Sequence, residues 1–220
     1  MTQQSPSPRQ ALLALLAGSA ALLAIKSLLW PRWPSAQPLQ PEVISNALQT
    51  AGFEARPQRP LPAHRSYERS TSAGLRFAIG EGQSLSLIRG RVRERLTLQA
   101  ALLANADPGS RLQQRRLVNG PPRSALGTLA GAPTRQTCLV VGKKGSSDVA
   151  VVGDALLQLV EQQPRSRADR LESLLGLRQP LDYGCVLISV SSAPAQGAIS
   201  EPRWQRLLMA LQQALERDPS

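Results

Sequence analysis

The sequence predicts an α+β protein, with one N-terminal transmembrane helix followed by a mostly antiparallel sheet packed with three to four helices. Three observations lead to this class. A mainly apolar run of 20 residues lies near the N-terminus, several later segments alternate apolar and polar residues, and others repeat with the period of a helix. These elements follow one another without the regular βαβ alternation that is typical of a parallel sheet.

The apolar run covers residues 11–30 and reads ALLALLAGSAALLAIKSLLW, which matches the roughly 20 residues that a helix needs to cross a bilayer. Lys26 lies near its end, where the ammonium group can reach the lipid headgroups. Trp30 and Trp33 belong to the residue type that is favoured at the membrane interface. We therefore predict an N-terminal tail over 1–10, a transmembrane helix over 11–30, a Pro-rich linker over 31–40 and an extracytoplasmic α+β domain over 41–220.

Two other interpretations of the apolar run stay open. A cleaved signal peptide requires small residues at a cleavage site, for which Ser35-Ala36 is a weak candidate. A buried core helix is the other interpretation, but the Pro-rich linker that follows gives it nothing to pack against. The charges that flank the run give almost no bias in orientation. If the run works as an uncleaved signal anchor, the domain lies on the outer side of the inner (plasma) membrane.

The first half of the domain is predicted to contain one helix and several strands. The apolar residues of 41–51 share one helical face. The segments 75–79 and 84–88 alternate with a period of two and predict a hairpin. An extended stretch over 91–103 follows, and a further strand is predicted over 111–118.

The second half is predicted to supply the centre of the sheet. The apolar runs TCLVV at 137–141 and CVLISV at 185–190 are typical of central strands that are covered on both faces. The segments 154–163 and 166–175 between them predict two helices. A last helix, with a stripe of leucines, begins near Ser200 and is expected to pack on the sheet.

The two cysteines, Cys138 and Cys185, lie in the two predicted central strands. If these strands are neighbours, an oxidising compartment would allow a disulfide that closes a loop of about 47 residues. Two buried, unpaired thiols are the alternative. A Cys–His hydrolase that uses His64, the only histidine, is disfavoured because reactive thiols lie in exposed, electropositive surroundings.

Other signatures of catalysis or cofactor binding are weak. The segment Gly142–Ser147 superficially resembles a phosphate loop but lacks the GxxxxGK[ST] spacing. Two cysteines and one histidine are too few for a four-ligand structural zinc site. Acidic residues are scattered, with no pair spaced for general acid–base catalysis. We therefore expect no enzyme activity, no cofactor and no metal site.

Arginine dominates the charge of the chain. The formal net charge is +11, and the segment from Arg56 to Arg123 contains thirteen arginines but only four acidic residues. Arg89, Arg91, Arg93 and Arg95 recur with a period of two and would share one face of an extended strand. Such a face can contact anionic lipid or an acidic partner, although a solvated face and a compositional excess of arginine explain it as well. Nucleic acid is disfavoured because aromatic residues are few.

Several segments together resemble one known family, the cyanoexosortase A system-associated proteins. The segments that carry the resemblance are WPRWP, SLSLIRGRVRERLTLQAALLA, QTCLV, LESLLGL, LDYGCVLISV and WQRLLMALQQAL. The resemblance implies a membrane accessory encoded with a multi-pass exosortase, an enzyme class associated with protein sorting. Accessory proteins of this type resemble, more distantly, a domain associated with exopolysaccharide export systems. The resemblance to this family identifies no catalytic residue in the present sequence.

Two functions follow as expectations. The first is a membrane-anchored, non-enzymatic accessory whose partners are the lipid bilayer and an exosortase. The alternative is a binding module for anionic polysaccharide or lipid headgroups that uses the predicted arginine face.

Overall fold

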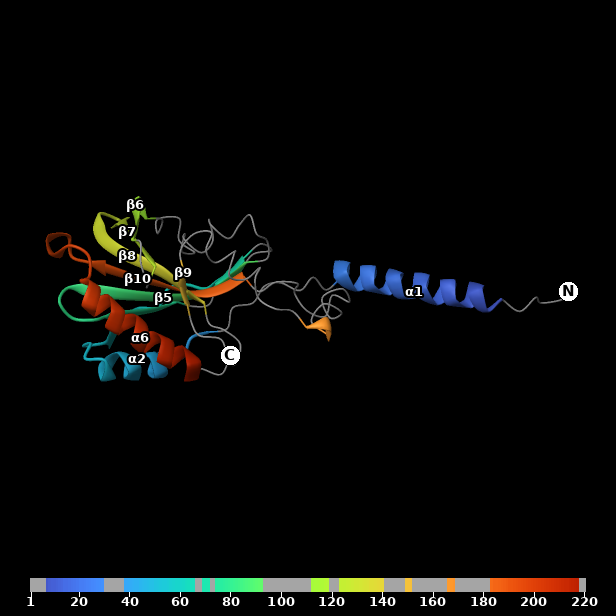
Figure 1. Ribbon diagram of the computed structural model, residues 1–220, viewed down its shortest axis with the longest axis horizontal. Helices are drawn as coiled ribbons and strands as arrows, with labels where there is room; N and C mark the ends of the chain where they lie inside the picture. Colours follow the sequence, from blue (N-terminus) through green and yellow to red (C-terminus); the bar gives the residue numbers. More distant parts are fainter. Residues whose placement is uncertain are drawn as a thin grey trace. The chain divides into compact units, whose positions relative to one another are not determined.

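The computed structural model describes residues 7–29, 38–65, 69–71, 74–92, 112–118, 123–140, 149–151, 166–168 and 183–217. The chain divides into two compact units (Figure 1). One comprises Met1–Arg32 and Pro164–Leu181, and the other comprises Trp33–Gln163 and Asp182–Ser220. Each unit is described by itself.

The first unit contains helix α1 (Pro8–Leu29), whose side chains are described as far as Leu22. The helix begins three residues before the predicted start at residue 11 because Ser7 and Gln10 cap it. The Gln10 amide donates to Ser7 Oγ at 3.3 Å, and the Ser7 amide donates to Gln10 Oε1 at 3.1 Å. Pro8 suits the first turn because it has no N–H to leave unpaired.

A helix is present where the transmembrane helix was predicted over 11–30, although Trp30 lies outside the described residues, and a role in crossing a membrane stays a prediction. Among the residues described, no helix is both long enough and apolar enough to cross a membrane.

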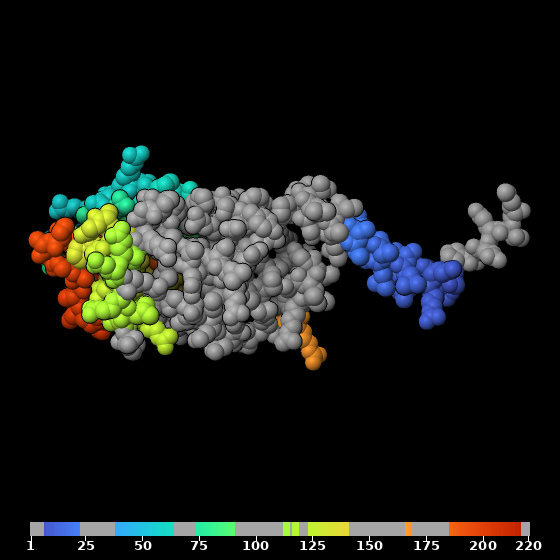
Figure 2. Space-filling model, turned by 90° about the horizontal axis from the view of Figure 1, so that it is seen from above, coloured from blue at the N-terminus to red at the C-terminus, as the bar shows by residue number. Residues whose placement is uncertain are grey.

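The second unit is built on an antiparallel sheet (Figure 1). Seven strands follow one another across it in the order β1-β4-β5-β10-β8-β7-β6, while β3 also pairs with β5, β2 with β3 and β9 with β8. The ten strands described are β1 (Arg56–Pro57), β2 (His64–Arg65), β3 (Arg69–Thr71), β4 (Leu75–Ala78), β5 (Gln83–Val92), β6 (Gln113–Val118), β7 (Ser124–Leu129), β8 (Ala132–Val140), β9 (Val149–Val151) and β10 (Tyr183–Ser192). Strands β6, β7 and β8, coloured lime to yellow, reach the surface in the view of Figure 2.

The predicted hairpin is confirmed as β4 and β5, joined by a tight turn. Glu81 adopts a φ of 49°, flanked by Gly80 at 78° and Gly82 at 61°. Three successive residues in the left-handed region explain why glycine stands at two of them. The turn brings Phe77 opposite Leu85 and Leu75 opposite Leu87.

Two helices, α2 (Pro41–Thr50) and α6 (Glu201–Arg217), contribute to the hydrophobic core together with one face of the sheet (Figure 1). This helix-covered face carries Phe77, Leu85, Leu87, Leu139, Val186, Ile188 and Val190. From the helices, the core receives Ile44, Leu48, Trp204, Leu207, Leu208, Leu211 and Leu215. A short 3-10 helix, η3 (Pro194–Gln196), precedes α6.

Most of the described elements agree with the sequence predictions. The predicted helix over 41–51 is α2, and the last helix is α6. The predicted central strands are confirmed as β8 and β10, which are neighbours inside the sheet. Strand β7 was missed, and so were the short strands β1, β2, β3 and β9. The predicted helix over 154–163, most of that over 166–175, and the stretch 93–103 lie outside the described residues.

Candidate functional site

A disulfide joins Cys138 and Cys185, as the sequence allowed, so the alternative of two free thiols is wrong. The two Cα atoms lie 5.8 Å apart. Cys138 pairs directly with Leu187, so the bridge runs diagonally between the neighbouring strands β8 and β10. Both cysteines are buried, on the sheet face opposite the helix-covered face. The bridge therefore fastens the two strands at the centre of the sheet.

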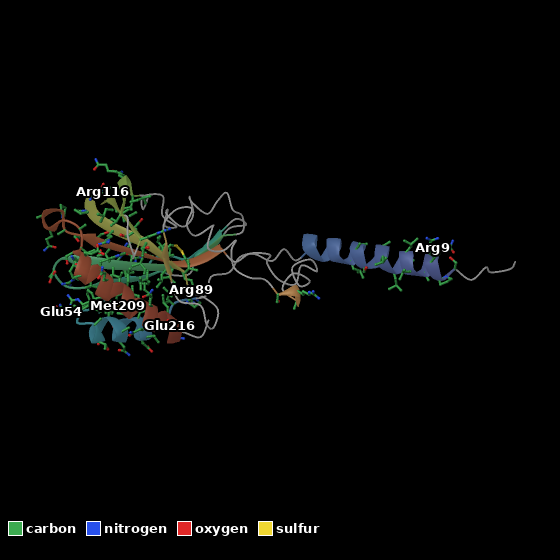
Figure 3. All side chains as sticks on the ribbon, viewed as in Figure 1. Arg9, Glu54, Arg89, Arg116, Met209 and Glu216 are labelled. Carbon is green, nitrogen blue, oxygen red and sulfur yellow. A yellow bond between two sulfur atoms is a disulfide. The ribbon has the colours of Figure 1, made fainter. Side chains whose placement is uncertain are left out.

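The predicted arginine face is described only in part. Arg89 lies in β5 on the helix-covered face, opposite Val186, and its exposure is 9%, so it is not on an open strand surface (Figure 3). The backbone of Arg91 continues this strand, while its side chain, Arg93 and Arg95 lie outside the description. A role for these arginines in anion or partner contact stays a prediction.

The other predicted site residues are described only as backbone or not at all. Lys26 belongs to α1 and His64 to β2, but their side chains are not described. Trp30, Trp33 and the segment Gly142–Ser147 lie outside the described residues.

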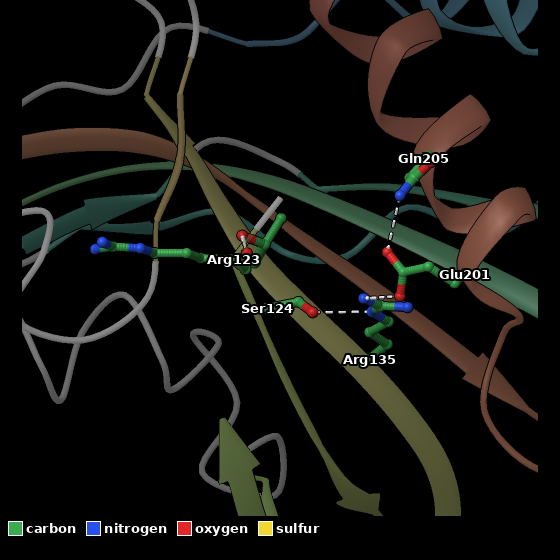
Figure 4. A network of polar contacts seen from close by, with 6 residues as sticks. Arg123, Ser124, Arg135, Glu201 and Gln205 are labelled. Atoms are coloured by element: carbon green, nitrogen blue, oxygen red, sulfur yellow. Dashed lines mark hydrogen bonds and ion pairs between the residues drawn. The ribbon is translucent and has the colours of Figure 1, made fainter. Parts of the chain in front are cut away.

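A buried arginine that sequence reasoning missed lies under the first turns of α6 (Figure 4). Arg135 in β8 is 3% exposed, and its Nε donates to Ser124 Oγ at 2.9 Å. Its Nη2 lies 2.7 Å from Oε2 of Glu201, and its Cζ lies 4.9 Å from the centre of the Trp204 ring. Gln205 Nε2 donates to the other carboxylate oxygen of Glu201 at 3.3 Å.

This network satisfies a charge that would otherwise be costly to bury. An arginine without a partner in a protein interior is strongly destabilising, whereas a carboxylate and an aromatic ring face compensate it. The side chain of Glu201 is 48% exposed, so the pair lies at the boundary between core and solvent. The sequence did carry a signal, because the alternation in β8 places Arg135 on the same face as Leu139.

A second arginine holds the same end of α6. Arg203 Nη2 donates to the carbonyl of Ile79 at 2.8 Å, and Nη1 forms an ion pair with Glu81. Its Cζ lies 5.1 Å from the centre of the Phe53 ring. Arg203 thereby connects α6 to the β4–β5 turn and to the segment after α2. Both arginine networks position elements of the fold.

Within the part of the chain that the structure describes, no three His, Cys, Asp or Glu side chains gather as a metal site would require. Comparison with family models, with curated proteins and with solved structures finds no match for this chain. Membership of the cyanoexosortase A system-associated family therefore stays a prediction.

Proposed function

We propose that this protein is a membrane-anchored, non-enzymatic accessory, held at the inner (plasma) membrane by the segment 11–30. The observation that carries the proposal is the surface of α1. Leu12, Leu13, Leu15, Leu16 and Leu22 are between 58% and 73% exposed. In α6, by contrast, four leucines are buried in the core.

The apolar surface of α1 extends around the helix. At about 100° per residue, the described leucines spread over about half of the circumference. Alanines and Gly18 occupy most of the remainder. Ser19 is the only polar residue between Ala11 and Leu22, and its hydroxyl donates to the Leu16 carbonyl at 2.9 Å. A helix that is apolar all round needs an apolar environment, and lipid is the environment we propose.

The disulfide supports a location on the extracytoplasmic side. Structural disulfides persist in oxidising compartments and are rare where cellular reductants keep thiols reduced. The bridge between Cys138 and Cys185 is therefore consistent with a domain held outside the cytoplasm.

The proposed partner is a multi-pass exosortase, on the strength of the sequence resemblance. Tethering two proteins to one membrane raises the effective concentration of each for the other. An accessory of this kind would recruit or position the enzyme and would itself contribute no reacting group.

The anchor is tested by fractionating cells that express the full-length chain. We expect the protein in the membrane fraction, resistant to extraction at alkaline pH. Leu15→Asp combined with Leu16→Asp should release it, whereas Gln10→Asp, just before the apolar run, should not. Recovery of the unaltered protein in the cytosolic fraction without detergent would contradict the proposal.

The location is tested by labelling an introduced cysteine. Gln213 is exposed on α6, so Gln213→Cys provides a thiol at the surface of the domain. A membrane-impermeant maleimide should label it in cells with a permeabilised outer barrier but an intact inner membrane. Labelling only after lysis would place the domain in the cytoplasm.

The partner is tested by co-purification from detergent extracts. A tagged copy of this chain should retain the exosortase encoded with it, and an equally expressed unrelated single-pass protein should not. Repeated failure to recover the enzyme would contradict the accessory role and leave the anchor unaffected.

A further inference from the structure

Two buried polar side chains face each other on the helix-covered face of the sheet. Ser192, the last residue of β10, pairs directly with Gln83, the first residue of β5. Their exposures are 2% and 8%. Val190 and Leu85, two positions away along the same strands, belong to the hydrophobic core, so Ser192 and Gln83 point to the same side of the sheet.

Arg135 bounds this pair on the side of β8, where it lies under the first turns of α6 (Figure 4). Its direct partner on β10 is Val190, two positions from Ser192 and on the same face. The ring of Trp204 lies over the guanidinium group of Arg135, with 4.9 Å between the ring centre and Cζ. Trp204 is therefore held beside the strand end that carries Ser192.

Arg203 bounds the pair on the side of β4. Its Nη2 donates to the carbonyl of Ile79 at 2.8 Å, and the Ile79 amide donates to the carbonyl of Gln83 at 3.0 Å. Arg203 and Trp204 are consecutive residues of α6, so the first turns of this helix lie over the start of β5 and the end of β10. We call the side chains at this position the polar layer, and its members are Gln83, Ser192, Arg203 and Trp204.

Each member of the polar layer has a buried polar atom for which the described part of the chain provides no hydrogen-bond partner. These atoms are Gln83 Oε1, Ser192 Oγ, Arg203 Nε and Trp204 Nε1. Nearly all buried polar groups of folded proteins are paired, either with protein groups or with ordered water, because an unpaired one is costly. Four such atoms in one layer therefore point to a bound ligand.

We infer that the polar layer binds ordered water. Arg203 Nε and Trp204 Nε1 can only donate, Gln83 Oε1 can only accept, and the hydroxyl of Ser192 does either. Water matches this mixed set, because it both donates and accepts and makes about three hydrogen bonds when it is buried. An anion would leave the Gln83 oxygen unpaired, and a cation would leave both N–H groups unpaired.

The charges and the burial of the layer agree with an uncharged ligand as small as water. Arg135 already forms an ion pair with Glu201, and Arg203 with Glu81, so neither guanidinium group requires a further anion. The low exposure of Ser192 excludes a ligand that must enter from the surface as a large molecule.

Water at this position would connect α6 to the sheet. The helix supplies the two N–H donors, and the strands supply the amide oxygen and the hydroxyl group, so a bridging water links elements that make no direct hydrogen bond through these atoms. The start of α6 would then be held by arginines and water, whereas its later turns are held by Leu211 and Leu215 in the core. This inference is independent of the proposed anchor and partner.

The water is detected by NMR on the full-length protein in detergent, with ¹⁵N-labelled tryptophan. The indole N–H of Trp204, assigned by its loss in Trp204→Phe, should show a nuclear Overhauser effect to water with the sign of a long-lived contact. Gln83→Leu combined with Ser192→Ala should abolish this signal. Ser191→Ala is the control, because the Ser191 hydroxyl bonds to Thr134 on the opposite sheet face, and it should leave the signal unchanged. No water contact in the unaltered protein, or a signal that survives in the double variant, would overturn the inference.

The melting temperature of Ser192→Ala provides a second test, because the two states of the hydroxyl predict opposite signs. Removing an unpaired buried hydroxyl should leave the melting temperature unchanged or raise it. Removing one that is bound to water should lower it by about 2–4 °C. Ser191→Ala, which loses a direct hydrogen bond to Thr134, sets the scale for such a loss. An unchanged or higher melting temperature of Ser192→Ala would overturn the assignment of water to this layer.

Discussion

Helices α1 and α6 are both long and rich in leucine, yet their leucines have opposite surroundings. In α1, of 22 residues, the described leucines are exposed. In α6, of 17 residues, Leu207, Leu208, Leu211 and Leu215 are buried against the sheet and α2. The difference lies in where the polar residues stand. Helix α6 has Gln205, Arg206 and Gln213 on its exposed side, whereas α1 has no polar side. Pattern, and not leucine content, determines what a helix packs against.

The largest expected effect comes from the residue that anchors α6 in the core. Trp204 is fully buried, so Trp204→Ala should lower the free energy of unfolding by about 3–5 kcal/mol. Leu16→Ala in α1 is the matched control and should change it by less than about 0.5 kcal/mol. Urea unfolding of the full-length protein in detergent, followed by far-ultraviolet circular dichroism, measures both. A similar loss of unfolding free energy in the two variants would contradict the contrast between a buried α6 and an exposed α1.

The disulfide should have the next largest effect, because it fastens two of the strands that α6 packs against. The sequence separation of 47 corresponds to about 4 kcal/mol in the chain-entropy treatment of the unfolded state. Cys138→Ala with Cys185→Ala should lower the urea midpoint accordingly, and a reductant should do the same to the unaltered protein. A midpoint that neither change moves would contradict a structural role for the bridge.

The ion pair under α6 should have a smaller effect. Glu201→Ala removes the carboxylate that compensates Arg135 and should cost about 1–3 kcal/mol, moderated by the partial exposure of Glu201. Glu216→Ala, an exposed carboxylate near the end of the same helix, is the control and should cost less than about 0.5 kcal/mol. In a double-mutant cycle, Arg135→Met should reduce the cost of Glu201→Ala. Additive costs would show that the two residues do not interact.

The smallest effect on folding is expected in α1 itself. Leu15→Ser exchanges an exposed leucine for a polar residue and should leave the urea midpoint of the domain unchanged. The same substitution should increase the fraction of protein that alkaline treatment extracts from membranes. A shifted midpoint with unchanged extraction would show that α1 supports the domain and not membrane attachment.

Sequence reasoning succeeded where one residue pattern is sufficient for one element. The stripe of leucines predicted α6, and the short apolar runs around Cys138 and Cys185 predicted the central strands, because a run that is apolar on both faces is typical of a strand covered on both sides. Strand β7, with the sequence SALGTL, was missed because its Gly127 and small residues give little strand signal. It is a strand because β6 and β8 pair with it on either side.

By itself, the sequence determined which segments form the hairpin, the central strands and the main helices, because these depend on local periodicity and turn chemistry. Only the tertiary structure decided that Cys138 reaches Cys185, that Arg135 meets Glu201, and that Gln136 lies buried beside Ser189. Each of these contacts joins residues more than 40 positions apart. Strand order and register bring such residues together, and neither can be read from the pattern within a single segment.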